Sequence, residues 1–340
     1  MTTAFDRVEQ LRLLGRFDDA ERAAREALAA SPNDPGLLLG LAAVLYESGR
    51  LVDGLAAAEA AAAAAPEFDR PHVVRAALLS GLGRHEEAIE AAYRAVTLAP
   101  EETPGATMYA EVLKQAGRLP EAAQAAQRVV QLAPNSPASH FLLADVTSDL
   151  GDRETARQAY EEVLRLDPQH AVARHDLAVL DASRHRPAQA LRGLIDAGML
   201  APGMPKVMRT ITAVLWQLSW RLRMLLGLAT VAVIAAGGED PLDSTWSGRI
   251  AAAVTLAIAG GLTWWTVRDL PKQTRPVVRA ALQGDGPLRL TYAAVAACVL
   301  LLAVVLITGV GVFAALVWLV LGLLGGLAIV VRTVRRLRNG

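Results

Sequence analysis

The histidines are the residues of this sequence that acid–base catalysis or metal binding would use first, because imidazole titrates near neutral pH and ligates metals. The sequence has six of them, at His72, His85, His140, His170, His175 and His185. Their spacing is not that of a zinc site. His175 and Asp176 are adjacent, but consecutive residues of a helix point in different directions, so we expect these two not to face each other. We therefore expect no catalytic residue, no metal site and no cofactor.

Two further patterns that could do chemistry are weak. Trp246, Ser247 and Gly248 superficially resemble the turn around a serine nucleophile, but the leading glycine of that motif is missing. We find no phosphate-binding loop and no dinucleotide fingerprint. The single cysteine, Cys298, lies in an apolar run and is expected to be a packing residue. The sequence therefore favours a protein that is not an enzyme.

A period of 34 residues organises the first half of the chain. A glycine recurs with this step, at Gly15, Gly49, Gly83, Gly117 and Gly151. A proline recurs with the same step, at Pro32, Pro66, Pro100, Pro134, Pro168 and Pro202. A third register holds Ala20, Ala88, Ala122, Ala156 and Ala190, with Gly54 in that slot in the second repeat. Such a period is the signature of a repeat protein.

Each repeat predicts a pair of helices. The first runs into the glycine, as in residues 37–48 before Gly49, because glycine adopts the left-handed conformation that ends a helix. The second ends before the proline, as in residues 86–98 before Pro100, because proline cannot continue the helical hydrogen bonds. One pair cannot bury its own apolar stripe, so neighbours must stack, and at least about three repeats are needed for stability. Six are present.

The period and its residues resemble the tetratricopeptide repeat (TPR), over residues 1–202. This resemblance implies an all-α solenoid of about six repeats. Five are complete, and the sixth, residues 171–202, is divergent: it has His185 in the glycine slot, Asp181 where leucine is usual, and Pro187 opening its second helix. We interpret the sixth as a polar cap that ends the stack.

In TPR domains the first helix of each repeat lines the concave face, where peptides or proteins bind. Carried onto this sequence, that implies a groove lined by Leu39, Ala43, Tyr46, Val73, Ala77, Ser80, Thr107, Glu111, Lys114, Phe141, Asp145, Ser148 and His175. The N-terminal end of this set is apolar and suits an amphipathic helix or an apolar peptide, whereas Glu111, Asp145 and Asp149 favour a basic segment. The alternative is that some of these residues merely pack between helices.

Beyond the repeats the sequence predicts a membrane domain, residues 218–340, after a linker or interfacial helix at 203–217. Residues 290–331 carry no charge; as one helix they would extend about 63 Å, twice the thickness of the hydrocarbon layer, so we expect two spans, 290–308 and 311–331. Residues 250–267 form a third span. Residues 218–238 form a fourth, because Trp216 and Trp220 suit the interface and Arg221 and Arg223 can snorkel to it. The alternative for this segment is a helix that lies on the membrane surface. The fold prediction is thus a TPR solenoid followed by a four-helix membrane domain.

Charge predicts the orientation. The loop at 268–289 and the tail at 332–338 are rich in arginine, whereas Glu239, Asp240 and Asp243 follow the first span. Basic segments stay in the cytoplasm, so both termini and the repeats are expected there, at the cell membrane. Phe5 to Arg16 reads as a charged amphipathic helix, so we expect no secretion signal.

The net charge of zero divides unevenly: residues 1–205 have 20 Lys and Arg against 29 Asp and Glu, and residues 206–340 have 14 against 5. The basic half is expected to attract anionic lipid headgroups. An open hypothesis is that the acidic repeats dock onto the 268–289 loop.

Gly322 and Gly326 have the spacing of close helix packing, within the chain or in a homo-oligomer. Three lysines against 31 arginines are typical of a GC-rich bacterial genome, such as an actinobacterial one.

Together these features predict a membrane-anchored scaffold or adaptor whose cytoplasmic repeats bind a protein or peptide, with no nucleic acid partner. The alternatives are a transporter or channel subunit regulated by its repeats, and an accessory subunit of a membrane enzyme. Against transport, the spans offer little beyond Thr255, Thr263 and Thr308 to coordinate a solute.

Overall fold

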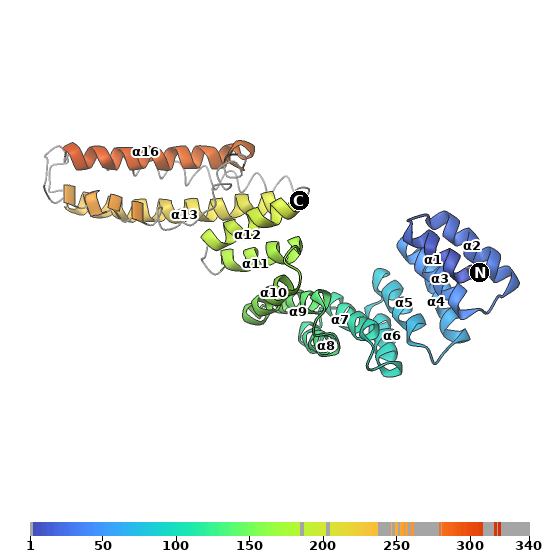
Figure 1. Ribbon diagram of the computed structural model, residues 1–340. Coiled ribbons are helices and arrows are strands. Elements are labelled where there is room, and N and C mark those ends of the chain that lie inside the picture. Colours follow the sequence, from blue (N-terminus) through green and yellow to red (C-terminus); the bar gives the residue numbers. More distant parts are fainter. Residues whose placement is uncertain are drawn as a thin grey trace. The chain divides into compact units, whose positions relative to one another are not determined.

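Helices follow one another along the part of the chain that the computed structural model describes: residues 3–183, 187–201, 205–236, 246, 249–250, 252–254, 256–257, 260–261, 279, 281–308, 316–317 and 319–320 (Figure 1). The helices with stated bounds are α1 Ala4–Leu13, α2 Phe17–Ala30, α3 Pro35–Glu47, α4 Leu51–Ala64, α5 Asp69–Gly81, α6 His85–Leu98, α7 Thr103–Gln115, α8 Leu119–Leu132, α9 Pro137–Leu150, α10 Arg153–Leu166, α11 Ala171–Ser183, α12 Pro187–Leu200, α13 Pro205–Ala236 and α16 Gly286–Thr308.

The helix pairs follow the 34-residue period. The first helix of the second repeat, predicted at 37–48, is α3, and the second helix of the third repeat, predicted at 86–98, is α6. The prolines at 32, 66, 100, 134 and 168 each lie two residues after the end of a second helix. The repeat boundaries predicted from glycine and proline are therefore confirmed within one or two residues.

The glycine turns have the predicted left-handed backbone, with φ of 78° at Gly49 and 76° at Gly117. After each of the first four glycines an arginine completes the turn. The backbone N–H of Arg50 donates to the carbonyl of Leu45 at 2.8 Å, which satisfies one of the carbonyls left open at the helix end. The guanidinium of Arg50 then binds Asp53 in the first turn of the next helix. Similar pairs recur at Arg16, Arg84 and Arg118.

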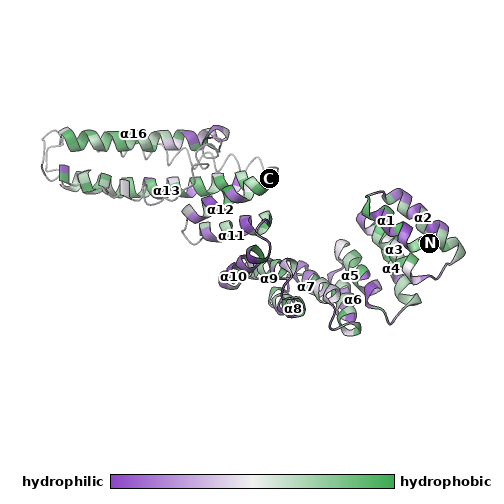
Figure 2. Ribbon diagram, in the orientation of Figure 1, coloured by the Kyte–Doolittle hydropathy of each residue, from purple (hydrophilic) through white to green (hydrophobic). Residues whose placement is uncertain are grey.

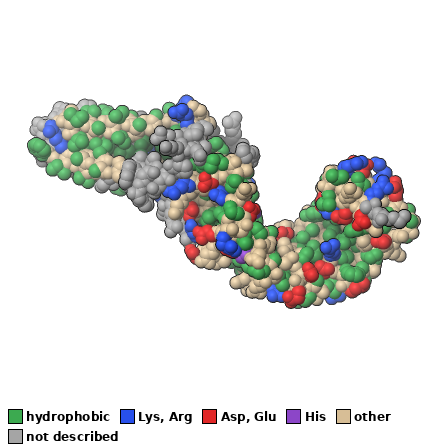
Figure 3. Space-filling view, viewed as in Figure 1, with side chains coloured by type: hydrophobic (Ala, Val, Ile, Leu, Met, Phe, Trp, Pro, Cys, Tyr) green, Lys and Arg blue, Asp and Glu red, His purple; other side chains and the backbone are tan. Residues whose placement is uncertain are grey.

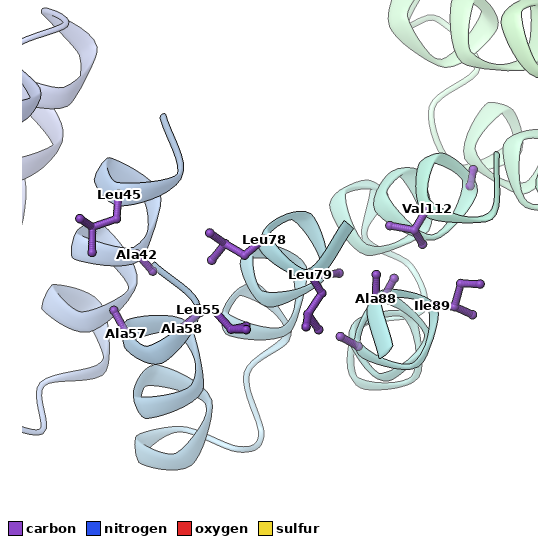
Figure 4. Close-up of a cluster of buried hydrophobic side chains, with 14 of the residues drawn as sticks. Ala42, Leu45, Leu55, Ala57, Ala58, Leu78, Leu79, Ala88, Ile89 and Val112 are labelled. Atoms are coloured by element: carbon purple, nitrogen blue, oxygen red, sulfur yellow. The ribbon is translucent and has the colours of Figure 1, made fainter. Parts of the chain in front are cut away.

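The alanine register lies where two helices approach most closely. Ala20, Ala88, Ala122, Ala156 and Ala190 are all fully buried. Gly54 holds the same slot in the second repeat, and there a Cβ atom would lie 2.8 Å from Cδ2 of Leu78. The core of the first repeats is built around these small residues, with Leu45, Leu78, Leu79 and Val112 filling the space between helices (Figure 4).

The chain divides into two compact units, residues 1–168 and 169–340. The first unit holds the first five repeats. The second holds the sixth repeat, α11 and α12, together with α13 and α16. This division differs from the predicted boundary at residue 202, because the sixth repeat packs against α13: Leu191, Leu194 and Ala197 of α12 form one buried cluster with Val207 and Ile211 of α13.

α13 is one continuous helix that includes residues 205–217, which the sequence analysis assigned to a linker or interfacial helix, and most of the predicted 218–238 span. α16 covers the predicted 290–308 span and begins four residues earlier. The two helices lie side by side (Figure 1), and Leu226 of α13 packs with Val295, Cys298 and Leu302 of α16. Cys298 is buried, as expected of a packing residue.

Among the described residues, one helix, α16, is long and apolar enough to cross a membrane. Only 28% of its most apolar stretch is buried, and Leu300 and Ile307 are among its exposed side chains. In Figure 2, α16 and the second half of α13 are coloured mainly as hydrophobic residues. Figure 3 shows apolar side chains over the same helices, whereas charged side chains are spread over the repeats. Most of the predicted spans at 250–267 and 311–331, most of the basic loop at 268–289, the basic tail, Gly322 and Gly326 lie outside the described residues.

Candidate partner-binding face

The first helices of the repeats in the first unit, α1, α3, α5, α7 and α9, contact one another in order. We call the side of the repeats that they form the first-helix face. Each of these helices also packs against the second helix of its own repeat, so one side of it is used for the core. The side chains of the first-helix face are therefore placed by the repeat itself, one set every 34 residues.

Polar contacts link neighbouring helices of this face at a sequence separation close to the period. The guanidinium of Arg12 on α1 forms an ion pair with Glu47 on α3, and the hydroxyl of Ser80 on α5 donates to the amide oxygen of Gln115 on α7. Both separations are 35 residues. The sequence analysis missed Arg12, Glu47 and Gln115, although this spacing was the signal that could have found them.

The most highly charged part of the face lies on α7 and α9. Nζ of Lys114 binds Asp145 and lies 3.2 Å from Oδ2 of Asp149. Burial lowers the pKa of Lys114, but the hydrogen bonds and charges of Asp145 and Asp149 outweigh it and the pKa is raised. Glu111 is half-buried beside them. Loss of hydration raises its pKa, the charge of Lys114 opposes that rise, and the charge of Asp145 adds to it.

This cluster has two carboxylates, Asp145 and Asp149, for one ammonium group, with Glu111 as a third acidic side chain whose charged form is disfavoured. Lys114 already neutralises part of the acidic end that was predicted to attract a basic segment. A basic ligand would therefore compete with Lys114 for these two aspartates, and half-exposed carboxylates can exchange partners in this way.

The predicted groove residues have different exposures. The half-buried ones are Leu39, Ala43, Val73, Ala77, Thr107, Glu111, Lys114, Phe141, Asp145 and Ser148. Tyr46 is 43% exposed, whereas Ser80 and His175 are buried, at 8% and 5%. Phe141 packs on the ring of Tyr160 in α10, with ring centroids 5.9 Å apart. Ser80, Phe141 and His175 thus make packing or helix–helix contacts, which was the alternative left open for individual positions.

His175 corrects one expectation. It lies in the second unit, and its Nδ1 is 2.8 Å from Oδ1 of Asp176, so the two neighbours do interact. The side chain of aspartate is long enough to bend toward the adjacent ring, a possibility that the argument from helix directions ignored. Nε2 of His175 lies 3.1 Å from the hydroxyl of Thr210 on α13.

These three groups have the order of a hydroxyl–imidazole–carboxylate arrangement. However, the hydroxyl of Thr210 also donates to the carbonyl of Lys206, at 2.9 Å, so its proton already has an acceptor within its own helix. The arrangement joins α11 to α13. In the part of the chain that is described, no group of three or more His, Cys, Asp or Glu side chains is placed to hold a metal ion.

Comparison with known proteins identifies the repeats. A family model described as tetratricopeptide repeat matches residues 11–78 and 79–146, and a second model with the same description matches residues 137–170. No curated protein matches the chain.

Two solved structures agree on the fold, and a third is similar over part of the chain. A PilF structure from Pseudomonas aeruginosa has a TM-score of 0.52 at 20% identity, over 61% of this chain and 94% of that one. The Cut9–Hcn1 hetero-tetramer of the APC/C has a TM-score of 0.55 at 15% identity, over 62% of this chain and 42% of that one. YrrB, a TPR protein with an unusual peptide-binding site, has a TM-score of 0.44 at 20% identity, over 55% and 97%. Residues 11–170 of the chain therefore match the tetratricopeptide repeat family, and the helix pairs observed there agree with that match.

Proposed function

We propose that this protein is a membrane-anchored scaffold whose first-helix face binds a peptide or protein partner at the cytoplasmic surface of the cell membrane. The observation that carries the proposal is the presence, in one chain, of tetratricopeptide repeats and of the apolar helix α16, of whose most apolar stretch only 28% is buried. Repeats of this family mediate protein–protein interactions, and an apolar helix of 23 residues has the length of a bilayer span.

The membrane part of the proposal comprises four spans with both termini inside the cell, anionic lipids at the basic surface, and packing through Gly322 and Gly326. The charge distribution of the sequence and the pairing of α13 with α16 support it. The anchor would raise the local concentration of the bound partner near the membrane without any chemical step, so we propose that the protein is not an enzyme.

The partner surface is proposed at the half-exposed positions Leu39, Tyr46 and Val73, on the same first-helix face as the Lys114 cluster. An apolar strip beside competing charges suits a short helix or extended segment that carries apolar side chains and at least one basic residue. Charged substitutions on the strip would leave an unpaired carboxylate against the apolar part of such a ligand.

The experiment is a crosslinked pull-down from native membranes. The double variant Leu39→Glu with Val73→Glu charges the face, and Tyr46→Glu repeats the test at a more exposed position. The matched control is Ala60→Glu with Gln124→Glu, which adds the same charge to exposed positions of second helices. A partner captured by the wild type and the control but lost from the face variants supports the proposal. Equal capture by all the chains excludes this face as the binding surface.

Anchoring is tested separately, by alkaline extraction of membranes. A scaffold with spans stays in the membrane pellet, whereas a protein held by charge alone is released. The second candidate function is a transporter or channel subunit. Solute flux through liposomes that contain the full chain would favour this function over a scaffold.

A further inference from the structure

α13 begins in register with the repeats. From the second repeat on, the first helices start at Pro35, Asp69, Thr103, Pro137 and Ala171, each 34 residues after the one before, and the next step gives Pro205, where α13 starts. Proline also opens α3 and α9, a position that tolerates it because the N–H groups of the first turn have no partner within the helix. A seventh first helix would begin at this residue.

The buried side chains of α13 repeat the pattern of the earlier first helices. Val207, Ile211, Val214 and Leu215 are at most 6% exposed, and they occupy the register positions of Leu37, Leu41, Val44 and Leu45 in α3. The register position of Leu215 holds leucine in the second, third and fourth repeats, as Leu45, Leu79 and Leu113. It holds Thr147 and Asp181 in the next two repeats, and α13 has leucine there again. A stack that ended at the sixth repeat would have no reason to restore this pattern.

The contacts of α13 are those of a repeat helix. It packs on α12, the second helix of the repeat before it, and touches α11, the first helix of that repeat. The bond from Nε2 of His175 to Thr210 joins residues 35 apart, which is the separation of Arg12 from Glu47 and of Ser80 from Gln115. The sixth repeat is therefore covered by α13 on the side where a seventh repeat would lie.

α13 then departs from the repeats where the glycine turn should be. Ser219 stands in the slot of Gly49 and Gly117, and instead of turning, the helix continues to Ala236 through exposed Met224, Leu228 and Val231. α16 packs on α13 near this residue: the hydroxyl of Tyr292 on α16 donates to the carbonyl of Leu215, one turn before Ser219, at 2.9 Å. The repeat-like and the apolar parts of α13 are thus one rod with no break between them.

We propose that α13 is both the first helix of a seventh repeat and the first membrane helix, so that the sixth repeat is held rigidly at the bilayer surface. Its membrane half rests on the function proposed above. Leu215, the last buried repeat position, lies about 8 Å along the helix from Trp220, at the rise of a regular helix. Trp220 is 57% exposed and stacks with Arg223, an arrangement suited to the headgroup layer. The sixth repeat has a fixed height and orientation at the membrane.

Hydrogen exchange on the full chain in lipid nanodiscs tests the proposal. The wild type is compared with Ile211→Asp, which charges the buried face of α13, and with Ile211→Ala, a milder variant. The matched control is Met208→Asp, because Met208 lies on the same helix but is 43% exposed. Amides of α5 to α10 report whether the first unit is still folded in each variant.

In the wild type, amides 209–223 are expected to exchange as slowly as those of α12. Protection of α12 should fall at least about tenfold in Ile211→Asp and less in Ile211→Ala, with no change in the control, because opening of α12 then no longer needs α13 to be displaced. Fast exchange of amides 209–217 in the wild type, or unchanged α12 in Ile211→Asp, overturns the proposal. Vesicle flotation tests the membrane part of the proposal separately from the repeat part. If the amides exchange as expected but the chain does not float with vesicles, α13 is a seventh repeat helix and the membrane anchor is excluded.

Discussion

The indole Nε1 of Trp216 donates a hydrogen bond to Oδ2 of Asp285, at 3.2 Å, and so joins α13 to α16 across 69 residues of sequence. The other oxygen of the same carboxylate accepts from the backbone N–H of Leu288, also at 3.2 Å. Asp285 is therefore the N-cap of α16 as well as its tie to α13. It is 8% exposed, so both of its oxygens depend on protein donors.

Trp216→Phe is expected to loosen the start of α16. The substitution keeps an aromatic ring but removes the indole donor to Oδ2, which should cost about 1–3 kcal/mol for a buried bond to a charged group. Thermal unfolding in detergent micelles measures the loss. Trp220→Phe is the control, because Trp220 is largely exposed; an equal effect of the two changes would contradict a specific role for the Trp216 bond.

Glu111→Gln is expected to stabilise the first unit at neutral pH. The pKa of Glu111 is raised, mainly by burial, so the folded chain binds this proton more tightly than the unfolded chain does. The ionised form thus costs stability above the raised pKa, and the cost disappears as pH falls below the ordinary pKa of glutamate. Urea unfolding should show a gain for the variant at pH 7.5 that shrinks toward pH 4.

The control for that measurement is Glu90→Gln, on the exposed side of α6. It removes the same charge from the chain, so any general effect of net charge appears in both variants. A gain at Glu111 that does not depend on pH would contradict the explanation by burial.

Ala58→Val should destabilise the second repeat by about 1–3 kcal/mol, because extra methyl groups overfill a close helix contact. Ala58 is fully buried on α4, whereas Ala60 on the same helix is exposed. Ala60→Val carries the same loss of helix propensity without the crowding, so the difference between the two variants isolates the packing. Chemical denaturation of the full chain, followed by circular dichroism, measures both; equal losses would show that helix propensity alone is at work.

Gly117→Ala should cost about 1–2 kcal/mol, since φ at this position is 76° and a Cβ in the left-handed region meets the backbone. No neighbouring atom lies within 4 Å of the added Cβ, so the loss comes from the backbone alone. Gly117→Asn should cost less, because asparagine tolerates this conformation. A similar midpoint of unfolding for Gly117→Ala and the wild type would contradict the turn assignment.

The sequence predicted the repeats well because their signals are local. A glycine that must be left-handed, a proline that ends a helix and an alanine at a close contact each constrain the backbone within a few residues, and repetition every 34 residues reinforces the prediction. The same period could have predicted α13 as a seventh first helix. Its long apolar continuation directed attention to the membrane instead.

The candidate face was predictable only in part. Which helix of each pair forms it follows from the family resemblance, but the partners of its side chains do not. The sequence analysis placed Lys114 in the groove without a partner residue, and the structure pairs it with Asp145 and Asp149. Long side chains choose among several neighbours at similar cost, and that choice depends on the positions of adjacent repeats.

By itself, the sequence determined that the chain is a helical repeat protein followed by apolar segments, because period, turn residues and hydropathy are properties of local composition. The tertiary structure decided that the sixth repeat is covered by α13, that His175 binds both Asp176 and Thr210, and that Asp285 joins α16 to Trp216. These contacts link residues up to 69 positions apart. They follow from how packed helices align: the 34-residue period indicates which helices are neighbours, but no local pattern of the sequence encodes which of their side chains bind one another.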